Sequence, residues 1–143
     1  MRSYLFDTNA ISLILSDALP EKWSRYWKEV KYGIKKVILF EGLVSEIFYK
    51  NAPEFGFRLM KKKLEWIKSL PKSDVVRITD EDAFQAGEYM VKLRNFGLSL
   101  IDAYILTLAQ KNTAIIITSD IALKQASKIV GVECDYLPLR KES

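Results

Sequence analysis

The sequence is 143 residues long, with 49% hydrophobic and 28% charged residues, which is the size and composition of one globular domain spanning 1–143. It contains no histidine, so catalytic triads that need an imidazole and all histidine-ligated zinc or iron sites are excluded. The single cysteine, Cys134, excludes an intramolecular disulfide and a cysteine-rich metal site. A net charge of +4 weakly favours a polyanionic partner.

Apolar runs are short throughout the sequence. The first, at 4–6, ends at Asp7, far short of a signal-peptide core. The longest, such as 37–40 and 114–117, have the length of strands and are too short to span a bilayer. Because a lone cysteine also suits a reducing compartment, we expect a cytoplasmic protein that does not enter a membrane.

Short β-branched runs alternate with longer helical patterns along the chain. In chain order the predicted elements are a strand at 4–6, helices at 9–16 and 21–31, a strand at 37–40, a helix from about residue 41, a helix at 54–69, a strand at 75–78, helices starting near residues 79 and 99, a strand at 114–118, a helix at 120–130 and a strand at 134–137. This alternation predicts the α/β class, with a mostly parallel sheet of about five strands flanked by helices.

Several residues mark where the helices begin and end. Thr79 followed by Asp82 is typical of a capping box, and Gly97 and Gly131 are suited to helix ends. In the helix at 54–69, the residues expected to face the core are Phe57, Met60, Leu64 and Ile67.

Two surface patterns each have two interpretations. The run Lys61-Lys62-Lys63 followed by Trp66 could track a phosphate backbone and stack a base, or it could be an ordinary solvated helix face. Trp23, Tyr26 and Trp27 lie at helical spacing, where they could anchor the core or form an interface.

Acidic residues follow the predicted strands. Asp7 comes directly after the first strand and Asp120 after the fourth, while Glu46 lies in the helix that follows the second. A fourth acid, Asp102, lies in the first turn of a very apolar helix. Because ligands of open parallel sheets bind outside the carboxyl ends of the strands, these acids are candidate site residues.

Each acid also has a purely structural explanation. Asp7 or Asn9 could cap the first helix, and Asp120 could cap the helix that follows it. Asp102 could be the third-position acid of a capping box that begins at Ser99. Taken singly, these explanations compete with a functional role.

Glu46 is harder to explain by structure alone, because it lies among apolar residues in the middle of a helix. One alternative is an i,i+4 pair with Lys50, which is worth only ~0.3–0.5 kcal/mol. The other is a metal ion. Two carboxylates about 5 Å apart repel by roughly 3 kcal/mol at an effective dielectric of ~20, and a divalent cation removes that cost. Oxygen-only ligands favour Mg²⁺ or Mn²⁺.

The sequence resembles the PIN domain (PilT N-terminus) nucleases, and among them the VapC-type ribonuclease toxins. The segments that carry the resemblance are the first strand with Asp7-Thr8-Asn9, Leu43-Val44-Ser45-Glu46-Ile47, Leu100-Ile101-Asp102-Ala103-Tyr104-Ile105, and Ile115-Ile116-Ile117-Thr118-Ser119-Asp120. Their order and the separation of 18 residues between Asp102 and Asp120 make the match specific. One departure is Glu41-Gly42, where the family often has a small hydroxyl residue, so the cap of that helix is in doubt.

The resemblance implies a three-layer sandwich with Asp7, Glu46, Asp102 and Asp120 gathered around Mg²⁺ or Mn²⁺. Thr8 or Asn9, and Thr118 or Ser119, would support the acids and the water molecules around the ion. It further implies an endoribonuclease that acts as the toxin of a toxin–antitoxin pair, forms a homodimer, and is held inactive by a cognate antitoxin.

Phosphodiester hydrolysis is also compatible with the residues available, since a bound divalent ion can activate water and neutralise developing charge without histidine. We hypothesise that Asp7, Asp102 and Asp120 are the principal ligands and that Glu46 orients the attacking water.

A phosphotransferase of the haloacid-dehalogenase type is disfavoured because Asn9 stands where it needs a second aspartate. A receiver domain is disfavoured because the third strand leads into the Thr79 helix cap. A housekeeping PIN nuclease and a non-catalytic PIN-like binding module stay as alternatives.

Overall fold

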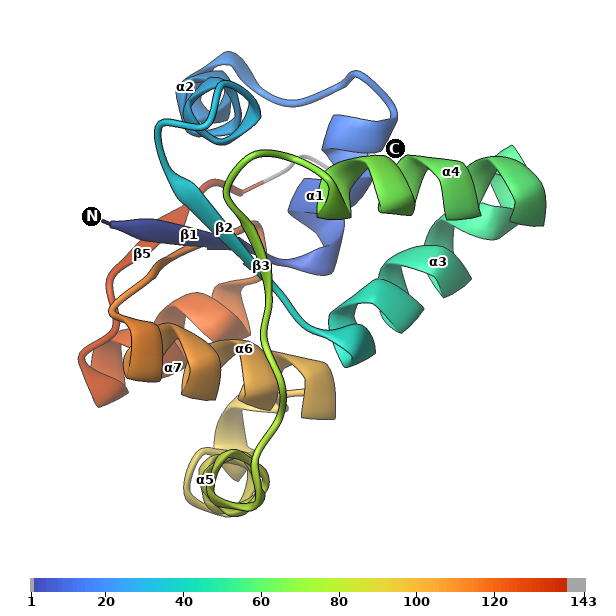
Figure 1. The fold of residues 1–143 in the computed structure, drawn as a ribbon. Coiled ribbons are helices and arrows are strands. Elements are labelled where there is room, and N and C mark those ends of the chain that lie inside the picture. The colour runs from blue at the N-terminus through green and yellow to red at the C-terminus, as the bar shows by residue number, and fades with distance from the viewer. Residues whose placement is uncertain (1, 139–143) are drawn as a thin grey trace.

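The computed structural model describes residues 2–138, which form a single parallel sheet covered by helices (Figure 1). The five strands are β1 (Ser3–Phe6), β2 (Lys36–Leu39), β3 (Ser73–Val75), β4 (Ile115–Thr118) and β5 (Cys134–Tyr136). Their order across the sheet is β3-β2-β1-β4-β5, and every pair is parallel. The predicted α/β class is therefore confirmed.

Helices cover both faces of this sheet, which makes three layers (Figure 1). Within the described residues the helices are α1 (Thr8–Leu15), α2 (Glu21–Lys31), α3 (Glu41–Phe55), α4 (Phe57–Lys68), α5 (Asp80–Lys92), a 3₁₀ turn (Arg94–Phe96), α6 (Leu100–Asn112) and α7 (Ile121–Val130). The first four lie towards one face of the sheet, α6 and α7 cover the other, and α5 packs outside α6. None of the helices in this part of the chain has the length and apolar character needed to cross a membrane.

The predicted third strand was placed too late in the sequence. The expected run was 75–78, whereas β3 pairs Ser73 with Val37 and Val75 with Leu39. Because β2 ends at Leu39, residues beyond Val76 have no neighbouring strand to pair with. An edge strand takes its limits from its partner, which hydrophobicity alone does not reveal.

The predicted helix at 54–69 was also wrong at its start. The preceding helix α3 continues to Phe55 and ends at Gly56, whose φ of 82° suits glycine. The next helix therefore begins at Phe57, which is 71% exposed instead of buried and whose ring packs against Phe48. Met60, Leu64 and Ile67 are buried as expected.

Helix caps match the sequence closely. Thr79 and Asp82 form a complete capping box, and Ser99 and Asp102 form another. Gly131 ends α7 in the left-handed conformation, while Gly97 ends the 3₁₀ turn that follows α5. The start of α3 at Phe40 has no side-chain cap, in line with the doubt raised by Glu41-Gly42.

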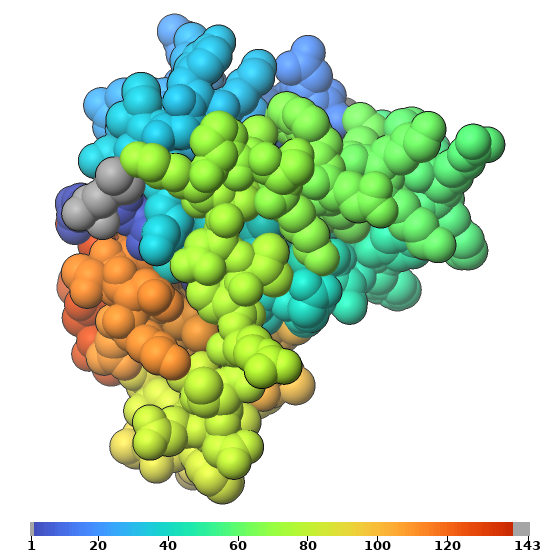
Figure 2. Space-filling model, viewed as in Figure 1, coloured from blue at the N-terminus to red at the C-terminus, as the bar shows by residue number. Residues whose placement is uncertain are grey.

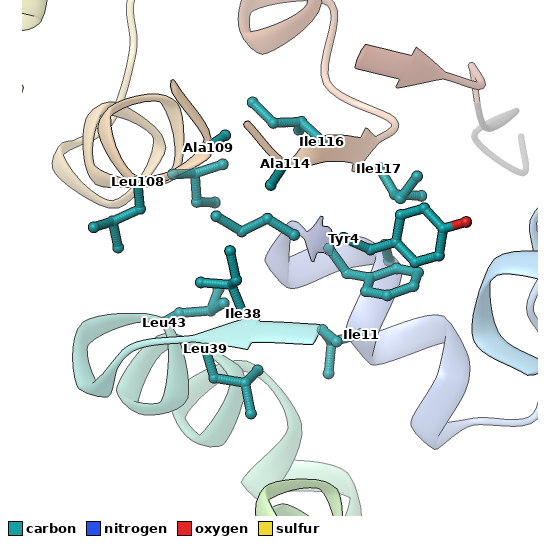
Figure 3. Close-up of a cluster of buried hydrophobic side chains, with 14 of the residues drawn as sticks. Tyr4, Ile11, Ile38, Leu39, Leu43, Leu108, Ala109, Ala114, Ile116 and Ile117 are labelled. Atoms are coloured by element: carbon teal, nitrogen blue, oxygen red, sulfur yellow. The ribbon is translucent and has the colours of Figure 1, made fainter. Parts of the chain in front are cut away.

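The hydrophobic core lies on both faces of the central strands. Figure 3 shows part of this core, with side chains from the sheet and from α6 gathered in one cluster, among them Tyr4 of β1, Ile38 and Leu39 of β2, Ile116 and Ile117 of β4, and Leu108 and Ala109 of α6. Continuous burial of Ile115–Thr118 is expected for a central parallel strand, which is covered on both sides. The core positions the carboxyl ends of β1 and β4 next to each other.

Helix α2 is anchored to the sheet by its aromatic residues. Trp23 is fully buried and its Nε1 donates to Asp135 Oδ1 at 3.4 Å, while the hydroxyl of Tyr26 donates to the same carboxylate. The ring of Trp27 packs edge-on against Phe6 of β1. These residues therefore serve the core.

We expect Trp23→Ala to lower the free energy of unfolding by about 3–5 kcal/mol, because it removes a fully buried aromatic side chain and leaves a cavity. Tyr32→Ala is the matched control: this tyrosine is 70% exposed, so the change should stay within about 0.5 kcal/mol. Urea denaturation measures both, and equal effects would contradict the described packing of α2.

Candidate functional site

The candidate site lies where the order of strands reverses. The chain passes from β1 outward through β2 to β3, and then returns to place β4 on the other side of β1. Such a switch point leaves a crevice beyond the carboxyl ends of the two central strands. Asp7 follows β1 directly, and Asp120 follows β4 by two residues.

A cleft of about 190 Å³ occupies this position. It is lined by Asp7, Thr8, Asn9, Glu46, Lys50, Ser99, Asp102 and Asp120. The structure therefore brings together all four acids named from the sequence, although they come from four separate segments. Of the supporting residues named with them, Thr8 and Asn9 line the cleft, whereas Thr118 and Ser119 do not.

Thr118 connects the two acids of the central strands. Its buried hydroxyl donates to Asp7 Oδ2 and accepts from the backbone N–H of Asp120 at 2.9 Å. Asp7 is only 4% exposed, and its other oxygen accepts from the Ala10 N–H at 2.8 Å. One threonine side chain thus sets the position of Asp7 relative to Asp120.

Three helices begin at the cleft, and each is capped by a site acid or its neighbour. Asp7 caps α1, Asp120 caps α7 by accepting from the Ala122 N–H at 2.9 Å, and Asp102 completes the capping box of α6 with Ser99. The structural explanations of these acids are therefore correct, and they do not exclude a functional one. Helix N-termini carry partial positive charge, which stabilises several carboxylates close together.

Glu46 reaches the cleft from the middle of α3. Its Oε1 accepts a hydrogen bond from the Thr8 hydroxyl and lies 4.0 Å from Lys50 Nζ. The side chain is 25% exposed, so the charge keeps contact with solvent. Thr8 therefore holds Glu46, while Asn9 is exposed at the rim.

Sequence reasoning missed two residues of this cleft as site residues. Lys50 was considered only as a surface ion-pair partner of Glu46, and Ser99 only as a helix cap. Both signals were present, since Lys50 is one helical turn from Glu46 and Ser99 caps the helix of Asp102. These spacings in the sequence predict that Lys50 contacts Glu46 and that Ser99 contacts Asp102. They do not predict which face of each helix is turned towards the other acids.

Burial and mutual repulsion raise the proton affinity of two acids. Burial raises the pKa of Asp7, and the negative charge of Asp120 adds to this, while hydrogen bonds from Thr118 and Ala10 act in the opposite direction. Burial, followed by repulsion from Asp120, raises the pKa of Asp102 to about 6. A cluster that resists carrying its full negative charge is the electrostatic setting in which a cation binds favourably.

The donor set suits a hard divalent cation, because it consists of carboxylate and hydroxyl oxygens without histidine or cysteine. Across residues 2–138, no three acidic, histidine or cysteine side chains stand in an arrangement that could hold a metal ion without some movement of the side chains. Three of the acids are engaged instead as helix caps and the fourth by Thr8.

Solved structures with similar folds come from several organisms. VapBC2 from Rickettsia felis, bound to a DNA fragment from its promoter, has a TM-score of 0.71 and 16% identity, over 94% of this chain and 98% of that chain. VapBC-1 from nontypeable Haemophilus influenzae has a TM-score of 0.69 and 15% identity, over 93% and 96%. PAE2754 from Pyrobaculum aerophilum has a TM-score of 0.56 and 18% identity, over 87% and 84%. These likenesses establish a shared fold.

No curated protein sequence matches the chain. The family model described as PIN domain, in contrast, matches residues 4–129, which include all but the first residue of β1, the strands β2 to β4, nearly all of α7 and the whole cleft. The fold and the resemblance noted from the sequence agree with this match, and the chain belongs to the PIN domain family.

Proposed function

We propose that this protein is an endoribonuclease that hydrolyses RNA phosphodiester bonds with Mg²⁺ or Mn²⁺, and that it is the toxin of a toxin–antitoxin pair. The observation that carries the proposal is the convergence of Asp7, Glu46, Asp102 and Asp120 in one cleft at the strand switch point of a PIN domain. Helix capping accounts for Asp7, Asp102 and Asp120 one at a time, but it does not account for Glu46 or for the meeting of all four carboxylates in one cleft.

In this mechanism, Asp7, Asp102 and Asp120 would hold the divalent ion directly or through water, and Glu46 would accept a hydrogen bond from the attacking water. The ion would lower the pKa of that water and neutralise negative charge on the phosphoryl group. Thr118 keeps Asp7 and Asp120 in register, and Thr8 orients Glu46. Asn9 and Ser119 complete the supporting set at the ends of the two strands.

A toxin role is favoured by the fold shared with VapBC structures, which cover almost the whole chain. A housekeeping PIN nuclease would use the same acids, and a non-catalytic PIN-like module would not need them. An antitoxin reading frame next to the gene would distinguish a toxin from a housekeeping nuclease. Metal-dependent cleavage of RNA would distinguish either nuclease from a non-catalytic module.

We expect cleavage of RNA by the wild type with Mg²⁺ or Mn²⁺ and none in EDTA. Asp7→Asn and Asp120→Asn should each lower the rate at least about 100-fold, because each removes a charge that holds the ion. Asn remains a good helix cap, so the fold should persist. Glu88→Gln, which removes an exposed acid of α5, is the control and should cleave normally. An unchanged rate in Asp7→Asn would remove Asp7 from the mechanism.

The free energy of unfolding should depend on pH through Asp102. The pKa of this carboxyl is about 6 in the folded protein and about 4 in an unfolded chain, so the folded state binds the proton more tightly. Its contribution is present below about pH 4 and is lost as the pH rises through about 6. Without metal, the wild type should therefore lose stability relative to Asp102→Asn over this interval. Urea melts across the range measure the difference, and a flat difference contradicts the burial of Asp102.

We further expect a homodimer and a cognate antitoxin that covers the acidic cleft. Coexpression with the product of an adjacent reading frame should give a complex in which RNA cleavage is suppressed, because the cleft is closed to substrate. Sedimentation of the isolated protein at micromolar concentration tests the dimer. A monomer alone would count against it, without bearing on the cleavage reaction.

A further inference from the structure

The acid cleft contains one cation in the described structure, Lys50 of α3. Its Nζ lies 4.0 Å from Glu46 Oε1, at the outer limit of an ion pair, and its side chain is 46% exposed. A surface pair of this kind contributes little to stability. The lysine therefore places a partly exposed positive charge at the edge of the candidate site.

Tyr49, the residue before it, is 77% exposed. It follows Glu46 by three residues and Ser45 by four, so both are its neighbours on the surface of α3. Glu46 lines the acid cleft, and Ser45 lines a second cavity. Tyr49 thus stands between the cleft and that cavity.

The second cavity, of about 430 Å³, lies between α3 and α4. Val44, Phe48 and Leu64 form its apolar part. Its charged residues are Lys61, Lys68 and Glu65, of which Lys68 is paired with Glu41 at 3.1 Å. Helices α3 and α4 project together from one side of the molecule (Figure 2).

The basic run named from the sequence does not form one surface. Lys63 Nζ lies 4.8 Å from the centre of the Phe55 ring, and the ring of Trp66 packs edge-on against Trp27 of α2. Lys61, in contrast, faces the α3/α4 cavity. The exposed aromatic residue next to the acid cleft is Tyr49 instead of Trp66.

We propose that Lys50, Tyr49 and the α3/α4 cavity form a binding track for single-stranded RNA that leads out of the acid cleft. Lys50 binds a backbone phosphate beside the cleft, Tyr49 stacks on the adjacent base, and the cavity accepts the next nucleotide between its apolar part and Lys61. Exposed aromatic rings combined with cations are typical of surfaces that bind single strands, and a duplex offers no free base faces for stacking. This inference rests on the proposed function and extends it to the path of the substrate.

Fluorescence anisotropy with a short labelled single-stranded RNA in EDTA measures binding in the absence of cleavage. Tyr49→Ala should weaken binding about 5- to 150-fold, the loss expected when one stacked base is released. Tyr49→Phe should bind as the wild type does, because stacking needs only the ring. Lys50→Gln should reduce the slope of log affinity against log salt by about 0.7, whereas Lys50→Arg should retain it.

Lys31 and Tyr32 provide a matched control on the same molecule. They are also an exposed lysine and tyrosine side by side, but they precede β2 and so lie at the opposite end of the strands from the acids. Lys31→Gln and Tyr32→Ala should leave RNA binding unchanged. Equal losses in both pairs would show general electrostatic attraction and overturn the track.

Cleavage in Mn²⁺ separates failure of the track from failure of the proposed function. If the wild type cleaves RNA and Tyr49→Ala raises KM with little change in kcat, the track is supported. If the wild type cleaves RNA and both Tyr49→Ala and Lys50→Gln bind it normally, the track is wrong and the nuclease function stands. Loss of self-association in Tyr49→Ala with normal RNA binding would assign the face to a second copy of the chain and also overturn the track.

Discussion

The site depends on the hydroxyl of Thr118, which bonds to Asp7 from β1 and to the backbone of Asp120 after β4. The two strands are hydrogen-bonded neighbours, and the Asp7 N–H continues their pairing by donating to Ile117 O at 3.0 Å. The buried core holds β1 and β4 in register, and this register sets the positions of their carboxyl ends. The Thr118 side chain then sets the positions of Asp7 and Asp120 relative to each other. The chemistry of the cleft therefore depends directly on the packing beneath it.

The N-termini of three helices meet at the same place, which explains how so many acids can be accommodated. Asp7 and Asp120 accept hydrogen bonds from N–H groups in the first turns of α1 and α7, and Asp102 accepts one from the N–H of Ser99 at the start of α6. These donors offset part of the burial and repulsion that raise the pKa of Asp7 and Asp102. The hydrogen bonds of the helix caps thus oppose the repulsion between the carboxylates, and a divalent cation would attract all of these carboxylates.

Most of the fold could be predicted from local signals. The helix caps at Thr79, Ser99 and Gly131 are short-range patterns with a direct physical cause, and the apolar run of β4 is typical of a buried strand. The boundary between α3 and α4 at Gly56 was missed because the helical patterns on its two sides follow each other without a gap in the sequence. The place of Lys50 was missed because it depends on how α3 packs against α1 and α6, which is a tertiary relation.

The double use of the acids limits how this site can change over evolutionary time. Replacement of Asp7 or Asp120 by alanine would remove a cap together with a negative charge, so the chain would lose both stability and the donor set. Asparagine or serine keeps the cap and removes the charge. A descendant that lost activity but stayed folded would therefore carry an amide or a hydroxyl at these positions, which gives decayed members of the lineage a recognisable sequence signature.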